Sequence, residues 1–347
     1  MEGFNVAVVG ATGLVGREFI KVLEQRNFPM RSIRLLASDR SAGTKLYVKH
    51  EECEVKETTS QSFSSVDIAL FSAGAETSTH YAPIAARAGA IVIDNSSAFR
   101  MDPSVPLVVP EVNPDDIKDH KGIIANPNCS TIQMVVALSP LHKVNPIKRI
   151  VADTYQSASG IGSAAMEELG EQSHLALEGR EVVPHLFPHQ IAFNVLPEID
   201  LFLDNGYTKE EWKLVEETQK IMHAPEIAIS ATAVRVPVSI GHSEAIHVEF
   251  TKAMSPQEAR QILAEAPGVK VLDDPAISLY PHPWSAAGTD EVFVGRIRKD
   301  ASHDCGLALW VVADNIRKGA ALNAVQIAET VIARGWIRME VRDGPAR

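Results

Sequence analysis

The sequence predicts an α/β protein with two domains: a doubly wound domain, then an α+β domain whose sheet is mixed and largely antiparallel. Its 347 residues are about twice the common domain length of roughly 150 residues. Apolar runs in the first third of the chain are short and continuous, which is typical of parallel strands covered on both faces. From residue 146 to about 310 the runs are longer and more alternating, which indicates antiparallel strands with one open face.

In the first domain, apolar runs predict six strands, and two segments with helical spacing predict helices. The expected strands are 4–9, 33–37, 67–71, 90–94, 107–109 and 122–125. One helix is expected directly after Gly10, and a second helix is expected at 76–88. The first strand, a glycine turn and the first helix therefore follow one another directly.

In the second domain, five longer runs predict strands at 147–155, 226–238, 244–250, 291–297 and 305–312. Helices are expected at 163–178, 208–223, 255–265 and 315–334. Thr208 and Ser255 are the expected N-caps of the second and third of these helices. Region 180–206 is rich in Pro, Gly and polar residues and is interpreted as an excursion toward a partner subunit.

Composition excludes several classes of protein. The hydrophobic fraction is 45% and the charged fraction 22%, as in ordinary globular proteins. The net charge of −11 disfavours nucleic acid and anionic membranes as partners. No apolar run approaches the ~20 residues of a membrane span, and no signal peptide is visible, so a cytoplasmic location is expected. Cys53, Cys129 and Cys305 are too far apart for a disulfide framework or zinc site. No metal site is expected at His185 and His189, which have metal-like spacing but no clustered carboxylate or thiol.

The stretch "GATGLVG" (10–16) indicates a nucleotide site. Gly10, Gly13 and Gly16 lie between a strand and a helix, where glycines allow a pyrophosphate to approach backbone N–H groups at the helix N-terminus. This is the context of a Rossmann-like domain, although the spacing departs from G-x-G-x-x-G, and a turn without a ligand is the alternative.

The end of the second strand indicates which dinucleotide is bound. There a carboxylate would hold the ribose diol of NAD, whereas a cation would hold the 2′-phosphate of NADP. The sequence "ASDRSAG" (37–43) offers Ser38, Arg40 and Ser41 for a phosphate, against Asp39 for a diol. We therefore favour NADP(H) as the cofactor; the alternative for Arg40 is a solvated loop charge.

Cys129 is the candidate nucleophile. It follows "NPN" and precedes "STIQMVVAL", an apolar helical pattern. Helix N-termini stabilise thiolates, so we expect a lowered thiol pKa. The Asn128 amide could donate to an oxyanion formed by attack on a carbonyl. The alternative is a buried, inert cysteine.

A nucleophilic cysteine beside a nicotinamide suggests thioester chemistry, in which an aldehyde and an acyl group are interconverted by hydride transfer. This chemistry also needs a group that moves the hydroxyl proton, and histidine is the usual choice. His242 follows a glycine between two predicted strands, whereas His247 lies within a strand and is interpreted as structural.

With these residues assembled, the chain resembles the aspartate-β-semialdehyde dehydrogenase family. The resemblance covers nearly the whole chain and is carried by "VAVVGATGLVG", "ASDRSAG", "DIALFSAG", "DNSSAFR", "VPLVVPEVN", "NPNCSTIQM", "TYQSASGIG", "ATAVRVPVSIGHSE" and "DNIRKGAALNAVQIAE". The conjunction of N-C-S-T, Y-Q-S-x-S-G, R-V-P-V and G-H-S is specific, whereas the glycine motif alone is shared with many oxidoreductases.

The resemblance implies a role for each matching residue. Catalytic roles fall to Cys129 as acyl-thioester nucleophile, His242 as general acid/base and Gln156 as orienting group. Substrate and phosphate contacts are implied for Arg100, Asn128, Glu217, Lys220 and Arg235, with Arg235 on the α-carboxylate and Glu217 on the α-ammonium. Because Glu210, Glu211 and Glu216 are close by, the register of Glu217 stays open. Cofactor contacts are implied for Gly10, Thr12, Gly13, Leu14, Val15, Ser38, Arg40, Ser41, Ser159, Gly160 and Asn315.

The resemblance also implies reduction of L-aspartyl-4-phosphate by NADPH to the semialdehyde and phosphate, in lysine, methionine and threonine biosynthesis. It implies a homodimer and a discontinuous first domain (1–127 plus about 315–347), with 128–314 as the catalytic and dimerisation domain. Two alternatives stay open: a related acyl-phosphate reductase, such as one acting on N-acetyl-γ-glutamyl phosphate, and a non-catalytic nucleotide-binding relative.

Overall fold

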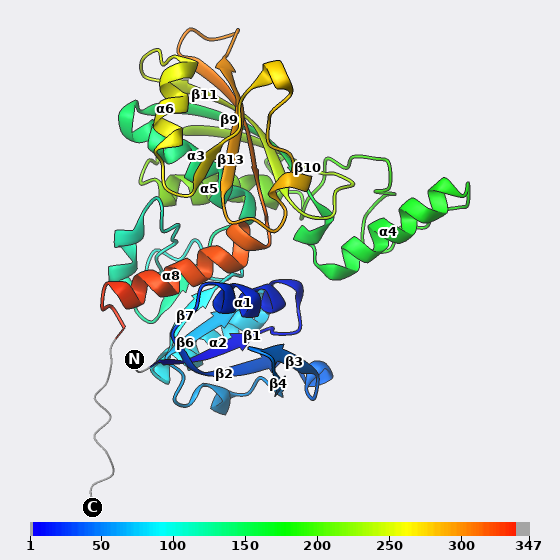
Figure 1. The fold of residues 1–347 in the computed structure, drawn as a ribbon, viewed down its shortest axis with the longest axis vertical. Helices are drawn as coiled ribbons and strands as arrows, with labels where there is room; N and C mark the ends of the chain where they lie inside the picture. Colours follow the sequence, from blue (N-terminus) through cyan, green and yellow to red (C-terminus); the bar gives the residue numbers. More distant parts are fainter. Residues whose placement is uncertain (1–2, 338–347) are drawn as a thin grey trace, which may run out of the picture.

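Two six-stranded sheets organise residues 3–337, the part of the chain that the computed structural model describes. The first sheet lies in the blue and cyan half of Figure 1, and the second lies in the green to orange half. Residues 1–2 and 338–347, which we expected to belong to the first domain, lie outside the described residues. The predicted pairing of a doubly wound α/β unit with a mixed-sheet unit is confirmed.

The first sheet is parallel throughout and has the order β5-β2-β1-β6-β7-β8. Its strands are β1 (Phe4–Val9), β2 (Met30–Ala37), β5 (Lys56–Glu57), β6 (Ile68–Phe71), β7 (Ile91–Asp94) and β8 (Ile123–Ala125). A separate antiparallel hairpin joins β3 (Lys45–Val48) to β4 (Glu51–Glu54).

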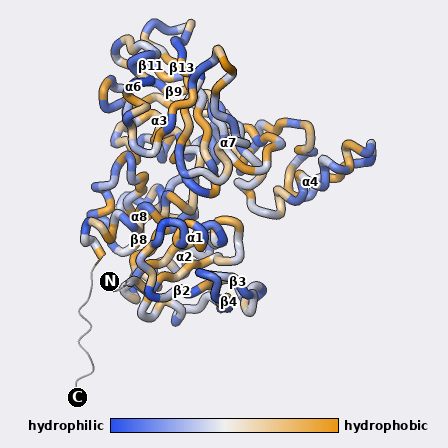
Figure 2. The backbone as a smooth tube through the Cα atoms, viewed as in Figure 1, coloured by the Kyte–Doolittle hydropathy of each residue, from blue (hydrophilic) through white to orange (hydrophobic). Residues whose placement is uncertain are grey.

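Helices cover both faces of this sheet, which explains its continuously apolar strands. On β1, Val6 and Val8 pack in one core with α1 (Leu14–Gln25) and α8 (Leu322–Ala333). Ala7 and Val9 belong to the opposite core, with α2 (Ala75–Arg87). In Figure 2 the strands carry much of the hydrophobic colour, in keeping with their burial.

One expected strand, 107–109, does not form. Only Leu107 makes a bridge, to Ala125. Pro106 and Pro110 on either side have no N–H to donate, and the Val109 N–H donates to the Asn113 side chain instead of to a strand.

The second sheet has the order β10-β9-β11-β14-β13-β12. Its strands are β9 (Ile147–Gln156), β10 (Ala228–Arg235), β11 (His242–Phe250), β12 (Val269–Val271), β13 (Val292–Lys299) and β14 (Gly306–Ala313). The three inner pairings are antiparallel and the two outer ones are parallel. One face packs on α3 (Cys129–Val144), α5 (Lys209–Ile221) and α6 (Pro256–Ala264). The other face carries Tyr155 and Trp310, whose ring centroids are 5.4 Å apart.

An arm projects from the second unit (Figure 1). It consists of α4 (Ser163–Leu177) and the segment 178–206, which contains no helix or long strand. Glu168 and Gln172 on α4 accept backbone N–H groups from this segment, at His185, Leu186 and Ile191. The excursion that composition predicted is therefore an ordered structure held by side chains of α4.

The last predicted helix begins differently from the expectation. Residues Arg317–Ala321 form a π-helical turn, η6, and only then does α8 begin. Helix α8 contacts α1 and β7, so this late segment packs against the first sheet. The short helix α7 (Pro283–Ala286) lies near β14. No helix within residues 3–337 is long and apolar enough to cross a membrane.

Candidate active site

Cys129 is the first residue of α3, as the sequence predicted. Asn128 is the N-cap, and its Oδ1 accepts the backbone N–H groups of Ser130 and Thr131 at 3.0 and 3.2 Å. An Asn before an apolar helical run is a preferred cap, so the local sequence explains where the helix begins. The cap places Cys129 in the first turn.

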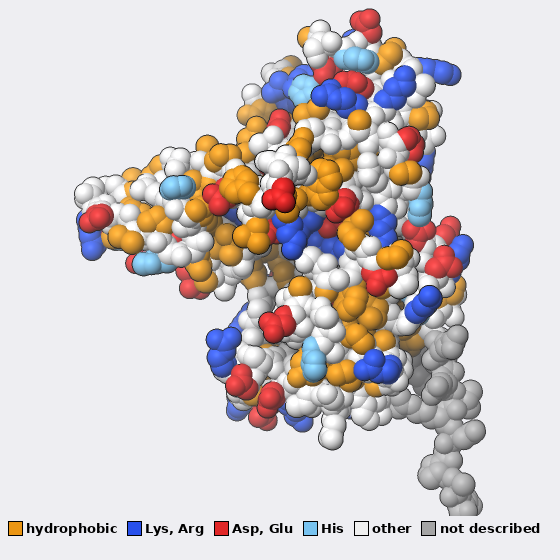
Figure 3. Space-filling view, turned by 180° about the vertical axis from the view of Figure 1, so that it is seen from behind, with side chains coloured by type: hydrophobic (Ala, Val, Ile, Leu, Met, Phe, Trp, Pro, Cys, Tyr) orange, Lys and Arg blue, Asp and Glu red, His pale blue; other side chains and the backbone are white. Residues whose placement is uncertain are grey.

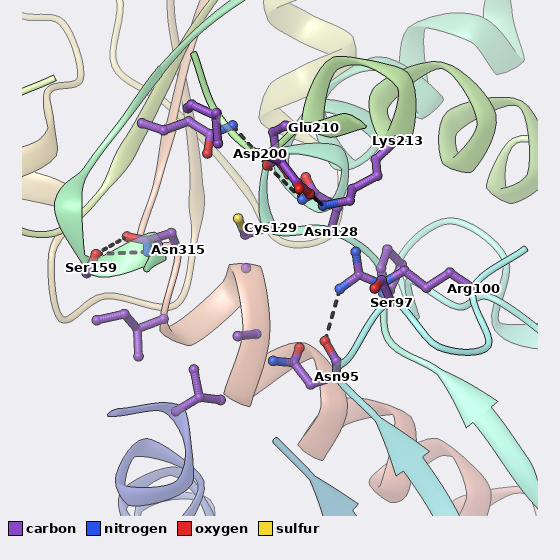
Figure 4. A pocket seen from close by; sticks show the side chains of 18 of the residues that line it. Asn95, Ser97, Arg100, Asn128, Cys129, Ser159, Asp200, Glu210, Lys213 and Asn315 are labelled. Atoms are coloured by element: carbon purple, nitrogen blue, oxygen red, sulfur yellow. Dashed lines mark hydrogen bonds and ion pairs between the residues drawn. The ribbon is translucent and has the colours of Figure 1, made fainter. Parts of the chain in front are cut away.

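A cavity of about 400 Å³ opens in front of Cys129, where the ends of several elements of both sheets meet (Figure 4). Its walls include nine of the residues implied by the resemblance: Val15, Arg100, Asn128, Cys129, Gln156, Ser159, Gly160, Arg235 and Asn315. They come from α1, the segment after β7, the start of α3, the end of β9 and the 3-10 turn Ala158–Gly160 after it, the end of β10 and the segment after β14. Residues far apart in the sequence thus share one site.

His242 lies just behind this wall and is fully buried. Its Nδ1 accepts the Ser157 backbone N–H at 3.1 Å, so the neutral ring carries its proton on Nε2. Nε2 has no hydrogen-bond partner among the described residues. A Cβ on Gly160 would lie 3.5 Å from Nε2, so the glycine keeps the space beside it clear. Burial, with a smaller effect of Arg235, lowers the pKa of His242 to about 3, and the ring is neutral at pH 7.

The carboxylate that faces the cavity is Glu210, not Glu217. Glu210 Oε1 accepts Asn128 Nδ2 at 2.8 Å and Gln156 Nε2 at 3.1 Å. Lys213 Nζ donates to Glu210 Oε2 at 3.0 Å. Burial raises the pKa of Glu210, but Lys213 and the two amides outweigh it and hold the pKa at about 2. Glu210 is therefore charged.

Glu217 and Lys220 lie further along the same face of α5 and do not line the cavity. Glu217 accepts Arg100 Nη1 at 3.0 Å and the Asn128 backbone N–H at 2.6 Å. Lys220 Nζ donates to the carbonyls of Arg100, Asp102 and Val105 at 2.7–2.9 Å. All three N–H donors of Lys220 are therefore engaged, and the pair holds the Arg100 segment in place.

Two arginines line the cavity from opposite units. Arg100 Nε and Nη2 donate to the carbonyls of Asn126 and Asn95, both at 3.0 Å. Arg235 Nη1 donates to the Ser157 carbonyl at 2.7 Å. Burial lowers the pKa of Arg235, yet a guanidinium remains charged. Two fixed cations thus border a cavity that also contains a thiol.

Burial changes the expectation for the thiol itself. The pKa of Cys129 is raised to about 12, chiefly by burial and then by Glu210, although Arg100, Arg235 and the Ser130 N–H oppose this. The lowered pKa that we inferred from the helix N-terminus is wrong for this state of the site. The helix effect is present, but loss of solvent exceeds it.

The turn between β1 and α1 suits a dinucleotide. Gly10 has φ +84°, and its Cβ would lie 2.2 Å from the Ser72 carbonyl oxygen; a Cβ on Gly16 would lie 2.1 Å from the Gly10 carbonyl oxygen. The fold itself requires these two glycines. Gly13 is different, because its φ is −72° and its Cβ would meet only one atom, at 3.4 Å. Glycine at 13 leaves open the cradle that a pyrophosphate needs at the start of α1.

Other candidate cofactor residues extend from this turn. Thr12 and Leu14 belong to the turn and the start of α1. Asn315 Oδ1 accepts the hydroxyl of Ser159 at 3.1 Å and the Gly241 N–H at 2.8 Å, so it joins the segments around His242. The remaining candidates, Ser38, Arg40 and Ser41, lie in or next to the short 3-10 helix Asp39–Ser41 after β2.

Arg40 is exposed at the carboxyl end of β2, the strand next to β1. The glycine turn follows β1 and Arg40 follows β2, so both lie at the same edge of a parallel sheet. A nucleotide whose pyrophosphate rests on the turn would extend toward Arg40. The residues present therefore fit NADP.

Glu210, Lys213, Asp200 and Gly319 all line the cavity. Sequence reasoning named Glu210 only as a neighbour that left the register of Glu217 open, and it missed the other three. Glu210 and Lys213 have the same three-residue spacing as Glu217 and Lys220, so a search of α5 for Glu-x-x-Lys finds both pairs. No motif or spacing in the neighbouring sequence marks Asp200 or Gly319 as a site residue. Between residues 3 and 337, no group of three or more His, Cys, Asp or Glu side chains is arranged to hold a metal ion.

Comparisons with known proteins agree with this geometry. Two family models match: "Semialdehyde dehydrogenase, NAD binding domain" over 5–120 and "Semialdehyde dehydrogenase, dimerisation domain" over 138–318. The chain is 59% identical over 339 residues to the aspartate-semialdehyde dehydrogenase of Aquifex aeolicus, spanning 96% of this chain and 100% of that one. To the Bacillus subtilis enzyme it is 52% identical over 338 residues, spanning 95% and 98%.

Solved structures are similar as well. Aspartate semialdehyde dehydrogenase II complexed with ASA, from Vibrio cholerae, has a TM-score of 0.94 and 49% identity, covering 96% of this chain and 99% of that one. Aspartate semialdehyde dehydrogenase with NADP, from Candida albicans, has a TM-score of 0.75 and 27% identity, covering 96% and 99%.

Proposed function

The chain belongs to the aspartate-semialdehyde dehydrogenase family, and on this premise we propose that it reduces L-aspartyl-4-phosphate with NADPH to L-aspartate-4-semialdehyde and phosphate. The resemblance inferred from the motifs is confirmed. The protein is then an NADP-dependent oxidoreductase of lysine, methionine and threonine biosynthesis. The observation that carries the proposal is one cavity that unites a thiol, a histidine nearby, and two arginines.

Cys129 performs the first step. Its sulfur attacks the acyl carbon of the acyl phosphate, the carbon–oxygen bond to phosphate breaks, and a thioester forms. The thiol proton ends on the departing phosphate, so charge and atoms balance. Because burial raises the pKa of Cys129 to about 12, the proton leaves as the sulfur–carbon bond forms. Arg100 stabilises the leaving phosphate through a guanidinium already oriented by Glu217.

His242 performs the proton transfer of the second step. NADPH, when bound, supplies the hydride that reduces the thioester carbonyl. The neutral His242 carries a proton on the unpaired Nε2 and donates it to the developing alkoxide. The resulting thiohemiacetal on Cys129 then collapses: its hydroxyl proton returns to His242 as the carbon–sulfur bond breaks and the aldehyde leaves, and the Cys129 sulfur takes from solvent the one proton that the reduction consumes.

Substrate recognition follows from the charged groups on the cavity wall. Arg235 pairs with the α-carboxylate, a bidentate task for which guanidinium is suited. Glu210 replaces Glu217 as the partner of the α-ammonium, because Glu210 lines the cavity and Glu217 does not. Gln156 donates to Glu210 at 3.1 Å and so keeps this carboxylate beside the substrate.

Cofactor binding is assigned to three regions of the chain. The glycine turn and the start of α1 hold the pyrophosphate, Arg40 with Ser38 and Ser41 holds the 2′-phosphate, and Ser159, Gly160 and Asn315 lie near the nicotinamide. The space left by Gly13 supports the first assignment. The exposed cation beyond β2 supports NADP over NAD.

We further assign the protein to homodimers in the cytoplasm. The match to a dimerisation domain supports self-association, and the open face of the second sheet carries Tyr155, which is 37% exposed, beside the half-buried Trp310. Figure 3 shows apolar side chains along the arm. Three apolar side chains of the arm, Leu177, Phe193 and Phe202, are 76%, 67% and 61% exposed. All three cysteines are free thiols, which a reducing compartment would maintain.

The two-domain division is proposed as 1–127 plus about 315–347, and 128–314. The packing of α8 on α1 supports it. The proposed partners are otherwise small molecules, the substrate and phosphate.

The test is phosphate-dependent reduction of NADP by the purified protein with L-aspartate semialdehyde. We expect turnover that requires phosphate and that is weaker with NAD. N-acetyl-glutamate semialdehyde serves as the matched control, because its acylated nitrogen cannot pair with Glu210. Turnover with the acetylated aldehyde alone, or NADP binding without turnover on either, would contradict the proposal.

A further inference from the structure

Asp200 reaches the cavity from an unexpected part of the chain. It lies at the end of the arm, in the return segment 178–206. Ile199 and Asp200 line the same cavity as Cys129, and Figure 4 places Asp200 next to Glu210 and Lys213. The arm therefore contributes a charged side chain to the site.

The contacts of Asp200 are specific. Its Oδ2 accepts Lys213 Nζ at 2.9 Å, and its Oδ1 accepts the Leu201 backbone N–H at 2.9 Å. Lys213 Nζ also donates to Glu210 at 3.0 Å. The side chain of Asp200 is 31% exposed, compared with 19% for Lys213 and 7% for Glu210. One ammonium is thus shared by two carboxylates on the cavity wall.

The backbone at Asp200 is held in an uncommon conformation. Its φ is +67°, a left-handed value that Asp and Asn tolerate better than other non-glycine residues. Such conformations concentrate at functional sites, where the surrounding structure maintains them. Here Leu201 is held on its other side, since its carbonyl accepts the Lys209 N–H at 2.7 Å. The start of α5 and the end of the arm are therefore tied together at this residue.

Without Asp200, Lys213 would have Glu210 as its remaining carboxylate partner. The two are three residues apart on α5 and are already paired at 3.0 Å, so without Asp200 the ammonium would pair with Glu210 alone. An unshared ammonium would bind more tightly to the carboxylate that the proposed function assigns to the substrate ammonium. Asp200 competes for the lysine and weakens its contact with Glu210.

We propose that Asp200 is a further positioning residue of the substrate site, which shares the Lys213 ammonium with Glu210 and so leaves Glu210 able to pair with the α-ammonium of the substrate. The inference rests on the proposed function. Partial burial raises the pKa of Asp200, but Lys213 outweighs it and holds the pKa below its ordinary value. The carboxylate is therefore charged when it meets the lysine.

The experiment uses Asp200→Asn in the full-length protein. Asn tolerates the positive φ and can still accept the Leu201 N–H, but it removes the charge that holds Lys213. The substrates are L-aspartate semialdehyde and succinic semialdehyde, which lacks the amino group. We expect KM for the amino substrate to rise about tenfold, as for loss of one hydrogen bond to a charged group. We expect kcat, and the slower reaction of succinic semialdehyde, to stay within threefold.

The controls separate positioning from folding. Asp204→Asn alters an exposed residue in the same loop and should leave both reactions unchanged. If Asp200→Asn does not fold, Asp200→Gly suits the same φ and should show the same selective loss. In a Lys213→Met background, Asp200→Asn should have no further effect.

Three results would overturn the inference: wild-type kinetics of Asp200→Asn, an equal loss on both aldehydes, or additive effects with Lys213→Met. Absence of phosphate-dependent turnover in the wild-type protein would instead remove the proposed function itself.

Discussion

Substituting Gly319 by alanine should displace the nucleophile. A Cβ at Gly319 would lie 2.9 Å from Cys129 Cβ and 3.3 Å from Cys129 Cα. Carbon atoms in contact prefer about 3.5–4.0 Å, so the two segments must separate by roughly 0.6–1 Å. Cys129 Cβ is one bond from the backbone of a helix whose next residues are buried, and a rotamer change cannot move it aside.

The magnitude follows from how sensitive reacting groups are to position. A displacement near 1 Å costs on the order of 100-fold in rate, so we expect kcat for Gly319→Ala to fall by about that factor. Overpacking should also lower the free energy of unfolding by about 1–3 kcal/mol. The π-helical turn around Gly319 supports this reasoning, because such turns are frequent at functional sites.

The assay is phosphate-dependent reduction of NADP at saturating substrate, together with chemical denaturation. Gly170→Ala is the matched control, since Gly170 lies in α4 with no atom near its missing Cβ. The control should keep its activity, and alanine should favour its helix. A Gly319→Ala enzyme with wild-type kcat would refute the claim that this contact sets the position of Cys129.

Three further predictions concern charge. His242 has a pKa lowered to about 3 and an ordinary value near 6.5 when unfolded, so the unfolded chain binds its proton first and stability falls as pH drops below 6.5. Between pH 6.5 and 4 the free energy of unfolding should fall by up to about 1.4 kcal/mol per pH unit because of His242, and His242→Asn should lack this part of the fall. If denaturant titrations show the same loss of stability per pH unit in the wild type and in the variant, this prediction is wrong. Arg40→Ala should raise KM for NADPH about tenfold or more and leave NADH unaffected, and equal losses would exclude a role at the 2′-phosphate. Glu217→Gln leaves Arg100 without its carboxylate and should lower the free energy of unfolding by about 3 kcal/mol, whereas Glu216→Gln, on a half-buried neighbour, should change it little.

Patterns that depend on nearest neighbours were predictable from the sequence. The continuous apolar runs of β1 and β6 indicate burial on both faces, and helices do cover both. Thr208 and Ser255 act as the expected N-caps. Cys129 lies at the helix start because Asn128 caps α3. In each case the cause lies within a few residues of the effect.

What escaped prediction depends on contacts between distant segments. Helical periodicity places Glu210 and Glu217 on one face of α5, but only the packing of α5 against α3 determines which of them meets the cavity. The pKa of Cys129 is raised by burial and by a carboxylate 81 positions away (Glu210). Asp200 lies in a segment with no helical or strand periodicity of apolar residues. Gly319 lies within the predicted helix 315–334, where nothing in the sequence distinguishes it. The carboxylate that lines the cavity and the pKa of Cys129 therefore both depend on tertiary packing, which the sequence pattern does not show.

The most direct test of the central claim is to follow the reverse reaction without phosphate. Wild-type protein mixed with L-aspartate semialdehyde and NADP should form up to one NADPH per active site in a burst. Acid-quenched protein should then carry one aspartyl group on the peptide containing Cys129, and added phosphate should discharge it. Cys129→Ala should still bind NADP and show no burst. Steady turnover by Cys129→Ala, or an unmodified Cys129 after a wild-type burst, would contradict a thioester on this cysteine.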